Sequence, residues 1–152
     1  MKTKAIQNSL FFKEIANRIA EDERVRIRAK GNSMLPFIRD SKDEIILEKP
    51  NKQSFQKGRL LLVQLEDKRY LLHRVKKVDG THLLLHGDGN LSILETCTTS
   101  NVIAEATTVI RNGKEIEKGS LKWNLYRYLW PRNLFLRRVG LGIYRRVVKL
   151  RV

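Results

Sequence analysis

The sequence predicts a mainly β protein: a small coiled antiparallel β-domain, preceded by an amphipathic helix and followed by a basic helical tail. Short β-branched and apolar runs alternate with turn residues between positions 24 and 117. Apolar residues recur every four positions before that region, and aromatic, aliphatic and basic residues alternate after it. We therefore divide the chain into a helix at 1–23, a β-domain at 24–117 and a tail at 118–152.

The N-terminal helix is expected over residues 5–22, where Phe11, Ile15 and Ile19 form one apolar stripe with Phe12 beside it. Charged residues interrupt every apolar run in this segment, so it lacks the apolar core of a signal peptide. No run approaches the roughly 18 apolar residues of a spanning helix. These features predict a cytoplasmic protein without a membrane-spanning anchor.

The β-domain is expected to contain several short strands joined by tight turns. Hairpin tips are predicted near Glu66–Lys68, Asp79-Gly80 and Asn112-Gly113, and the last two pairs favour type I′ turns. The predicted strands cover residues 24–30, 44–48, 59–65, 69–78, 82–87 and 102–111. No strand–helix alternation is present, which argues against a parallel sheet.

The tail carries much of the chain's net charge of +15, since ten of the 31 basic residues and none of the 16 acidic residues lie in 118–152. Aromatic and basic residues without acids are typical of a helix in an anionic membrane interface. We expect two helices broken near Pro131, with Trp123 and Trp130 inserting into lipid. Arginines at 137, 138, 145 and 146 would contact headgroups. Packing of the tail on the β-domain and binding of nucleic acid are the alternatives.

A candidate nucleophile lies in the segment GNSMLPF at 31–37, where Ser33 follows a glycine and precedes a proline. A serine hydroxyl needs a neighbouring base to attack at neutral pH, and His73, His82 and His86 are the available histidines. The same residues also fit an ordinary turn and ordinary strand histidines. Residue types alone leave both interpretations open.

The order of the motifs favours catalysis. GNSMLP, KGRLLLVQL, LLHRVKKV, LLLHGDGN and VIAEATTVIR follow one another between residues 27 and 111. This succession resembles the superfamily of type I signal peptidases and LexA-type autoproteases, and is closest to the endoplasmic-reticulum and archaeal signal peptidases. The resemblance implies their coiled β-fold, a serine endopeptidase activity on a peptide or protein precursor, and no metal or cofactor.

The resemblance also implies residue roles. Ser33 corresponds to the nucleophile, His73 to the general base, and Asp88 to the acidic residue of the G-D-x-N motif. Glu95 is the other acid that would orient His73, and the choice between Asp88, Glu95 and neither stays open. The substrate is expected to lie extended along a strand edge, where Met34 and Leu35 either line its groove or pack in the core.

The sequence departs from the signal peptidases in two places. Gly31 stands where those enzymes usually have a serine, so the oxyanion would rest on backbone N–H groups such as that of Ser33. We also expect no N-terminal membrane anchor of the kind those enzymes have. Self-cleavage of the LexA type is disfavoured, because residues 1–32 contain no Ala-Gly or Cys-Gly pair. A non-catalytic peptide-binding or accessory protein, and a basic membrane- or nucleic-acid-binding module, are the competing functions.

Overall fold

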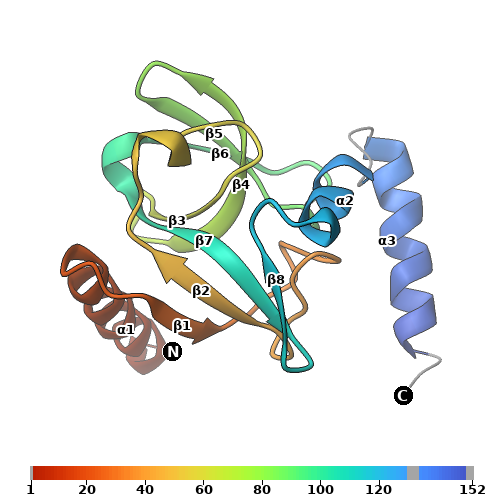
Figure 1. Ribbon diagram of the computed structural model, residues 1–152, viewed down its shortest axis with the longest axis horizontal. Helices are drawn as coiled ribbons and strands as arrows, with labels where there is room; N and C mark the ends of the chain where they lie inside the picture. Colours follow the sequence, from red (N-terminus) through yellow and green to blue (C-terminus); the bar gives the residue numbers. More distant parts are fainter. Residues whose placement is uncertain (1, 130–133, 150–152) are drawn as a thin grey trace.

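The structure is a computed structural model that describes the backbone of residues 2–129 and 134–149, and the side chains of 9–129 and 135–149. A strongly coiled antiparallel sheet forms its centre (Figure 1). Helix α1 (Lys2–Ala20) lies on one side of this sheet, and α2 (Leu121–Leu129) and α3 (Leu134–Lys149) lie on the opposite side. The strands are β1 (Val25–Arg28), β2 (Glu44–Glu48), β3 (Leu60–Gln64), β4 (Tyr70–Asp79), β5 (His82–His86), β6 (Leu94–Thr98), β7 (Val102–Arg111) and β8 (Lys114–Glu117).

The sheet coils because its two long strands change partners along their length. The order is β1-β2-β7-β3-β4-β5-β6, with β8 added beside β7. Strand β4 pairs with β3 over 70–74 and with β5 over 74–79. Strand β7 pairs first with β3 and then with β2 and β8, and register shifts interrupt its ladders with β3 and β2. Such irregularities increase the local twist and let the sheet curl around a core.

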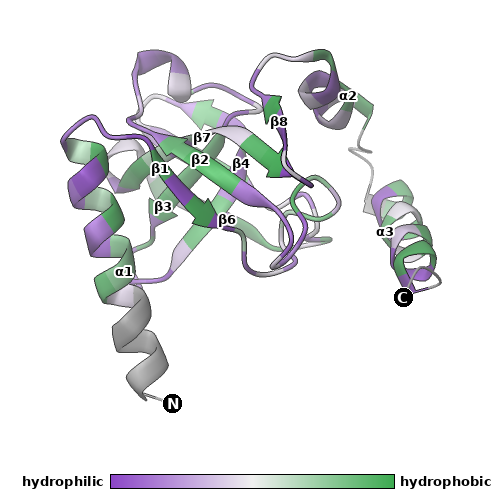
Figure 2. Ribbon diagram, turned by 60° about the horizontal axis from the view of Figure 1, so that its bottom comes forward, coloured by the Kyte–Doolittle hydropathy of each residue, from purple (hydrophilic) through white to green (hydrophobic). Residues whose placement is uncertain are grey.

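Two hydrophobic clusters fill the fold, and β3 separates them. Leu60 and Leu62 belong to the cluster beneath α1, whereas Leu61 and Val63 belong to the cluster under β4, β5 and β6. Successive side chains of a strand point to opposite faces, so β3 is apolar on both faces. Helix α1 buries Ile15 and Ile19 in the first cluster. Figure 2 shows the mixture of hydrophobic and hydrophilic residues along α1 and α3 that amphipathic helices have.

The predicted antiparallel β-domain is confirmed, although the chain as a whole is mixed rather than mainly β, because its three helices span 19, 9 and 16 residues. All six predicted strands form, and β6 and β8 add to them. Each of these two strands buries a single apolar side chain, Cys97 or Ile116, so neither shows an apolar alternation. The hairpin at 112–113 has two positive φ angles, as a type I′ turn requires. At the 79–80 tip, only Gly80 has one.

Helix α2 corrects the prediction that Trp123 inserts into a membrane. The Trp123 side chain is 3% exposed, and its ring packs edge-on against Phe37 with 5.0 Å between centroids. Arg137, predicted to contact headgroups, is also buried, at 8% exposure. Both side chains have partners on the β-domain that a linear sequence does not reveal. Trp130 and Pro131 lie outside the described residues, and within the described ranges no helix is both long and apolar enough to cross a bilayer.

Candidate active site

Ser33 lies in a compact turn that follows β1. The φ of Gly31 is +94°, a conformation that side chains with a Cβ rarely adopt, and its N–H donates to Asp40 Oδ1 over 2.8 Å. The Ile38 N–H donates to the Met34 carbonyl over 2.9 Å. Met34 is buried in the core, which decides between its two predicted roles, while Ser33 is partly exposed. The turn therefore presents Ser33 on a rigid support.

A buried carboxylate ties this turn to the sheet. Asp43 is fully buried and accepts hydrogen bonds from the guanidinium groups of Arg39 and Arg111, at 2.7 Å each. Arg111 also donates to the Phe37 carbonyl over 2.7 Å. Burial by itself raises the pKa of Asp43, but the bonds from Arg111 and Arg39 outweigh it and leave the pKa below its ordinary value. Asp43 is therefore ionised at neutral pH and holds the residues after Ser33 in place.

His73 sits in β4, opposite Leu61 of β3, and is 4% exposed. Its Nε2 approaches the Cα of Gly87 so closely that a Cβ built there would lie 3.0 Å from it. The same Cβ would collide with the Ser33 carbonyl oxygen. Ser33 and His73 therefore lie side by side at Gly87. Within the described part of the chain the Ser33 hydroxyl makes no hydrogen bond, so contact with His73 stays a prediction for the substrate complex.

The loop after β5 closes the site from the other side. The Gly89 N–H donates to the Ser33 carbonyl over 2.7 Å, and a Cβ at Gly89 would collide with the Asn32 carbonyl oxygen. The two glycines of the GDGN motif thus allow this loop to lie directly against the turn that carries Ser33, residues 31–38, which we call the nucleophile turn. The glycines of the sequence motif indicate this close approach, whereas its ionisable residues alone do not.

Replacing Gly87 with alanine is expected to separate Ser33 from His73, because the added methyl group would meet the backbone of the nucleophile turn. We expect acylation of Ser33 to fall by at least about 100-fold, since small misplacements of reacting groups have effects of that size. Gly142→Ala is the matched control, because a Cβ there meets nothing within 4 Å and Gly142 has no positive φ in α3. An unchanged acylation rate in Gly87→Ala would contradict the described packing.

His73 Nδ1 is buried and has no hydrogen-bond partner among the described residues, so neither candidate acid orients the ring through that atom. Asp88 accepts from Arg74, over 2.9 Å from Nε and 2.7 Å from Nη2. Glu95 is held by Arg69 over 3.1 Å. Asp88 lies near enough to His73 to raise its pKa, as expected for an acid near the base, but its carboxylate is hydrogen-bonded to the guanidinium of the next residue along β4. The reason is that Arg74 faces the GDGN loop and offers two donors in one plane.

The environment of His73 keeps the imidazole neutral. Burial lowers the pKa of His73 below its ordinary value of 6.5, against the smaller opposite effects of Glu95 and Asp88. Arg69 lowers it further. A neutral imidazole is the form that accepts a proton, so this setting suits a general base.

The acid limb of the pH–activity profile is therefore expected below pH 6.5, as His73 gains a proton only there. Glu95→Gln should move this limb to lower pH, because it removes a charge that raises the pKa of His73. Arg69→Gln should move it to higher pH by the opposite effect. Measuring kcat/KM against pH in the three proteins tests both signs, and equal profiles would show that His73 does not control activity.

A candidate hydrogen-bond donor for an oxyanion lies next to the Ser33 hydroxyl. The Ser33 amide donates to no carbonyl among the described residues, so it is available to a developing negative charge. Leu35 is 8% exposed and lines a groove next to the turn. The Ser33 hydroxyl, the His73 imidazole and the Ser33 amide are thus the candidate nucleophile, base and oxyanion donor of this site.

Helix α3 reaches the same loop through Arg137, which the sequence analysis did not assign to the site. Its guanidinium lies 2.8 Å from His86 Nδ1 and donates to the Asn90 carbonyl over 3.3 Å. Burial, and then the charge of Arg137, lower the pKa of His86. Arg137 thus fixes the loop that carries Gly87 and Gly89, and no local sequence signal indicated this long-range contact.

No known family model matches the chain, and no curated protein matches it.

Proposed function

We propose that the protein is a serine endopeptidase of the signal-peptidase-like type that cleaves a peptide or protein precursor. The observation that carries the proposal is that the Ser33 carbonyl oxygen and Nε2 of the buried His73 both lie within 3.0 Å of the Cβ position of Gly87. Burial of an unpaired imidazole is costly, and strongly perturbed ionisable groups cluster at functional sites. A serine beside such a base is the combination that acyl transfer needs.

The mechanism assigns a task to each group. His73 Nε2 takes the Ser33 proton while Oγ attacks the scissile carbonyl, and the Ser33 N–H stabilises the resulting oxyanion. His73 then gives the proton to the leaving amine as the C–N bond breaks. Water, deprotonated by His73, attacks the acyl-enzyme, and its proton passes to Oγ as the ester bond breaks. The enzyme acts as a dyad, with Leu61 and Gly87 packing around the His73 ring.

Two free strand edges would receive an extended substrate. Among the described strands, β1 pairs only with β2, and residues 70–73 of β4 pair only with β3. The unpaired half of β4 leads directly to His73. Unpaired N–H and C=O groups on such edges bind peptides by strand addition, which would bring a scissile bond to Ser33.

A fluorophosphonate, which phosphonylates reactive serines with loss of fluoride, tests the proposal directly. We expect stoichiometric labelling at Ser33 in the wild-type protein, and none in Ser33→Ala. His73→Gln should slow the labelling by at least about 100-fold, since the base contributes a factor of this order. An unlabelled wild-type protein that still binds extended peptides would instead favour the non-catalytic peptide-binding function.

The outer face of α3 favours an anionic membrane surface as a second partner. Leu136, Val139 and Ile143 are each at least 45% exposed and follow one another at spacings of three and four residues. These positions form one apolar stripe on a helix. Arg138 is also exposed on this helix. We propose that α3 lies in the membrane interface at the cytoplasmic side, with α2 remaining on the β-domain.

Vesicles that contain phosphatidylserine are expected to bind the protein and to release it as salt increases. Ile143→Glu should weaken this binding by about tenfold or more, because it places a charge in the apolar stripe. Trp123 should keep its emission maximum on binding, since its ring is already buried. A blue shift in a Trp130→Phe variant would show that α2 detaches and would contradict the proposed orientation.

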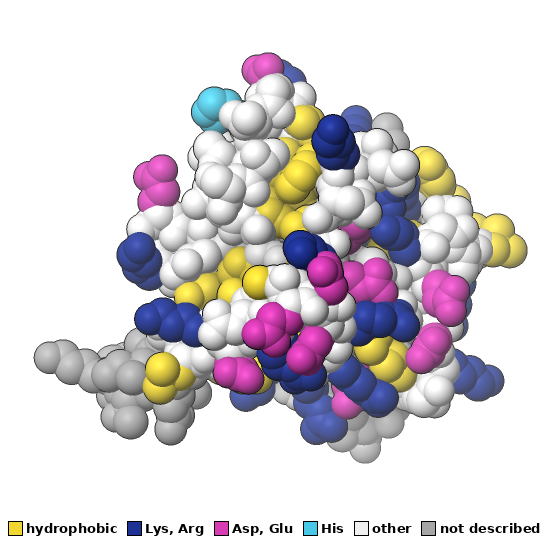
Figure 3. Space-filling model, turned by 60° about the vertical axis from the view of Figure 1, so that its left-hand side comes forward, with side chains coloured by type: hydrophobic (Ala, Val, Ile, Leu, Met, Phe, Trp, Pro, Cys, Tyr) yellow, Lys and Arg dark blue, Asp and Glu magenta, His cyan; other side chains and the backbone are white. Residues whose placement is uncertain are grey.

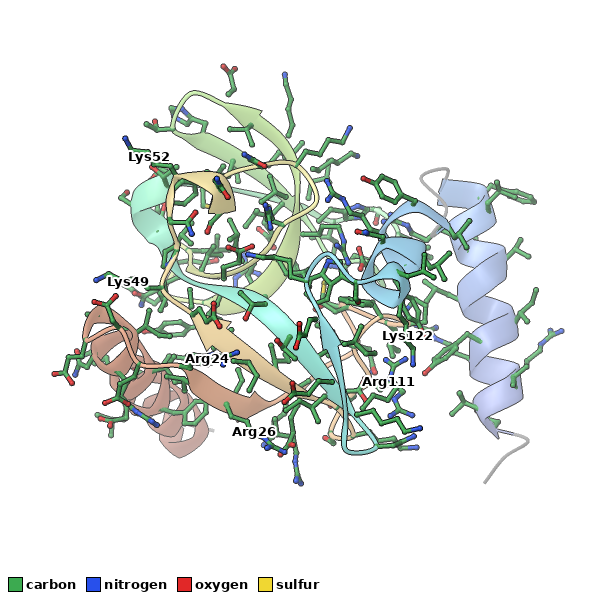
Figure 4. The ribbon with its side chains drawn as sticks, viewed as in Figure 1. Arg24, Arg26, Lys49, Lys52, Arg111 and Lys122 are labelled. Atoms are coloured by element: carbon green, nitrogen blue, oxygen red, sulfur yellow. The ribbon has the colours of Figure 1, made fainter. Side chains whose placement is uncertain are left out.

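Nucleic acid is the less favoured partner for the β-domain, because acidic side chains are interspersed among its basic ones. Arg24 lies 2.7 Å from Glu48, and Lys49 lies 3.1 Å from Asp22. Figure 3 shows acidic and basic side chains interspersed over one face of the molecule, and Figure 4 shows Arg24 and Lys49 far from α3. A phosphate backbone requires a continuous basic surface, which this face does not offer.

A further inference from the structure

We propose that the groove between α3 and the nucleophile turn binds an acidic, amphipathic segment of the peptide substrate. This inference rests on the proposed peptidase function and adds the substrate's chemical class. The groove has a volume of about 1190 Å³ and is bounded by α2, α3 and the residues that follow Ser33. This volume exceeds the roughly 300–1,000 Å³ of small-molecule pockets, so a length of polypeptide is the appropriate occupant.

The groove is contiguous with the candidate active site. Asn32 and Leu35, which flank the Ser33–Met34 pair in the chain, both line it. A peptide whose scissile bond lies at Ser33 therefore enters the groove within a few residues of that bond. Figure 4 shows Arg111 and Lys122 on the side of the β-domain that faces α3, which places both of these lining residues in the space concerned.

The positive charge of the groove favours a ligand that carries acidic groups. Seven of its lining residues are basic and one, Asp40, is acidic. Asp40 accepts the Gly31 N–H, and Asp43 neutralises Arg39 and Arg111 from beneath. The remaining cations have no ion pair with a described residue: Lys42, Lys122, Arg145, Arg146 and Lys149. They come from three separate elements and converge on one groove, so their mutual repulsion is relieved when an acidic ligand lies between them.

Apolar side chains make the occupant amphipathic. Leu125 and Leu129 of α2 line the groove and are 46% and 73% exposed, and Val147 of α3 lines it at 44%. Exposed aliphatic surface rimmed by charge is typical of an interaction site. Apolar residues of the substrate would cover these side chains while its carboxylates reach the surrounding cations. A peptide that is only acidic, or only apolar, would leave one half of the groove unmatched.

Binding to the full-length Ser33→Ala protein tests the inference without requiring cleavage. Two fluorescent peptides serve as probes: one combines Leu and Glu, and the other has each Glu replaced by Gln. The Glu peptide is expected to bind at least about tenfold more tightly at low salt, and the difference should shrink as salt rises. The double variant Lys42→Glu/Lys122→Glu should lose this preference. Lys114→Glu, an exposed charge reversal outside the groove, should retain it.

The outcomes separate this inference from the peptidase function and from the membrane proposal. Equal affinity for the two peptides, or an unchanged preference in the double variant, would overturn the groove assignment even if the fluorophosphonate labels Ser33. A confirmed preference in a protein whose Ser33 does not react would leave the groove assignment standing and remove the peptidase function. If Lys42→Glu/Lys122→Glu weakens vesicle binding as strongly as peptide binding, the groove takes lipid headgroups and the peptide assignment is wrong. Arg138→Glu, outside the groove, should weaken only vesicle binding.

Discussion

Replacing Ser33 with alanine is expected to abolish peptide cleavage, and His73→Gln is expected to reduce it by at least about 10⁴-fold. The double variant should be no less active than Ser33→Ala alone. The two side chains act as one unit, because His73 has no proton to remove once the hydroxyl is gone. The measurement is kcat/KM on a peptide that the wild-type protein cleaves.

Fold stability is the control for these variants. Ser33 is partly exposed and its hydroxyl makes no hydrogen bond with a described residue, so Ser33→Ala should melt within a few degrees of the wild type. His73 is buried, so His73→Gln is preferred to alanine because it leaves a smaller cavity. Cleavage that persists in Ser33→Ala would identify another nucleophile, and additive losses in the double variant would show that the two residues act separately.

Asp43→Ala is expected to lower the free energy of unfolding by about 3–5 kcal/mol, because it leaves two partly buried arginines without their fully buried acid. The pKa of Asp43 lies below 3.8 in the folded protein, so its contribution is present at neutral pH and is lost as pH falls through that range. Urea denaturation at pH 7 measures the effect. The nucleophile turn depends on the same carboxylate, so acylation of Ser33 should fall as well.

Glu23→Ala is the matched control for this change. The Arg18–Glu23 pair is as short, at 2.6 Å, but both side chains are 45% exposed, and exposed pairs contribute about 0–1 kcal/mol. If Asp43→Ala lowers the free energy of unfolding no more than Glu23→Ala does, the network beneath the turn adds nothing to stability. It would also remove the structural basis for a rigid Ser33.

Local patterns in the sequence were sufficient for most of the regular structure. The period of four residues in α1 and the short apolar runs of the six predicted strands arise from neighbours in the chain. The Asn112-Gly113 tip follows from backbone preferences of those two residues alone. Strands β6 and β8 did not follow from such patterns, because backbone pairing with β5 and β7 forms them with one buried apolar side chain each.

The sequence by itself determined which residues to consider at the site: the order of its motifs selected Ser33, His73 and Asp88. Only the tertiary structure decided what each of them meets. It placed Ser33 and His73 against Gly87, paired Asp88 with Arg74, and left His73 Nδ1 without an acid. It also buried Trp123 against Phe37 and carried Arg137 to His86. These contacts join residues far apart in the chain, or depend on which way a side chain points, so they form only when the coiled sheet brings distant segments together.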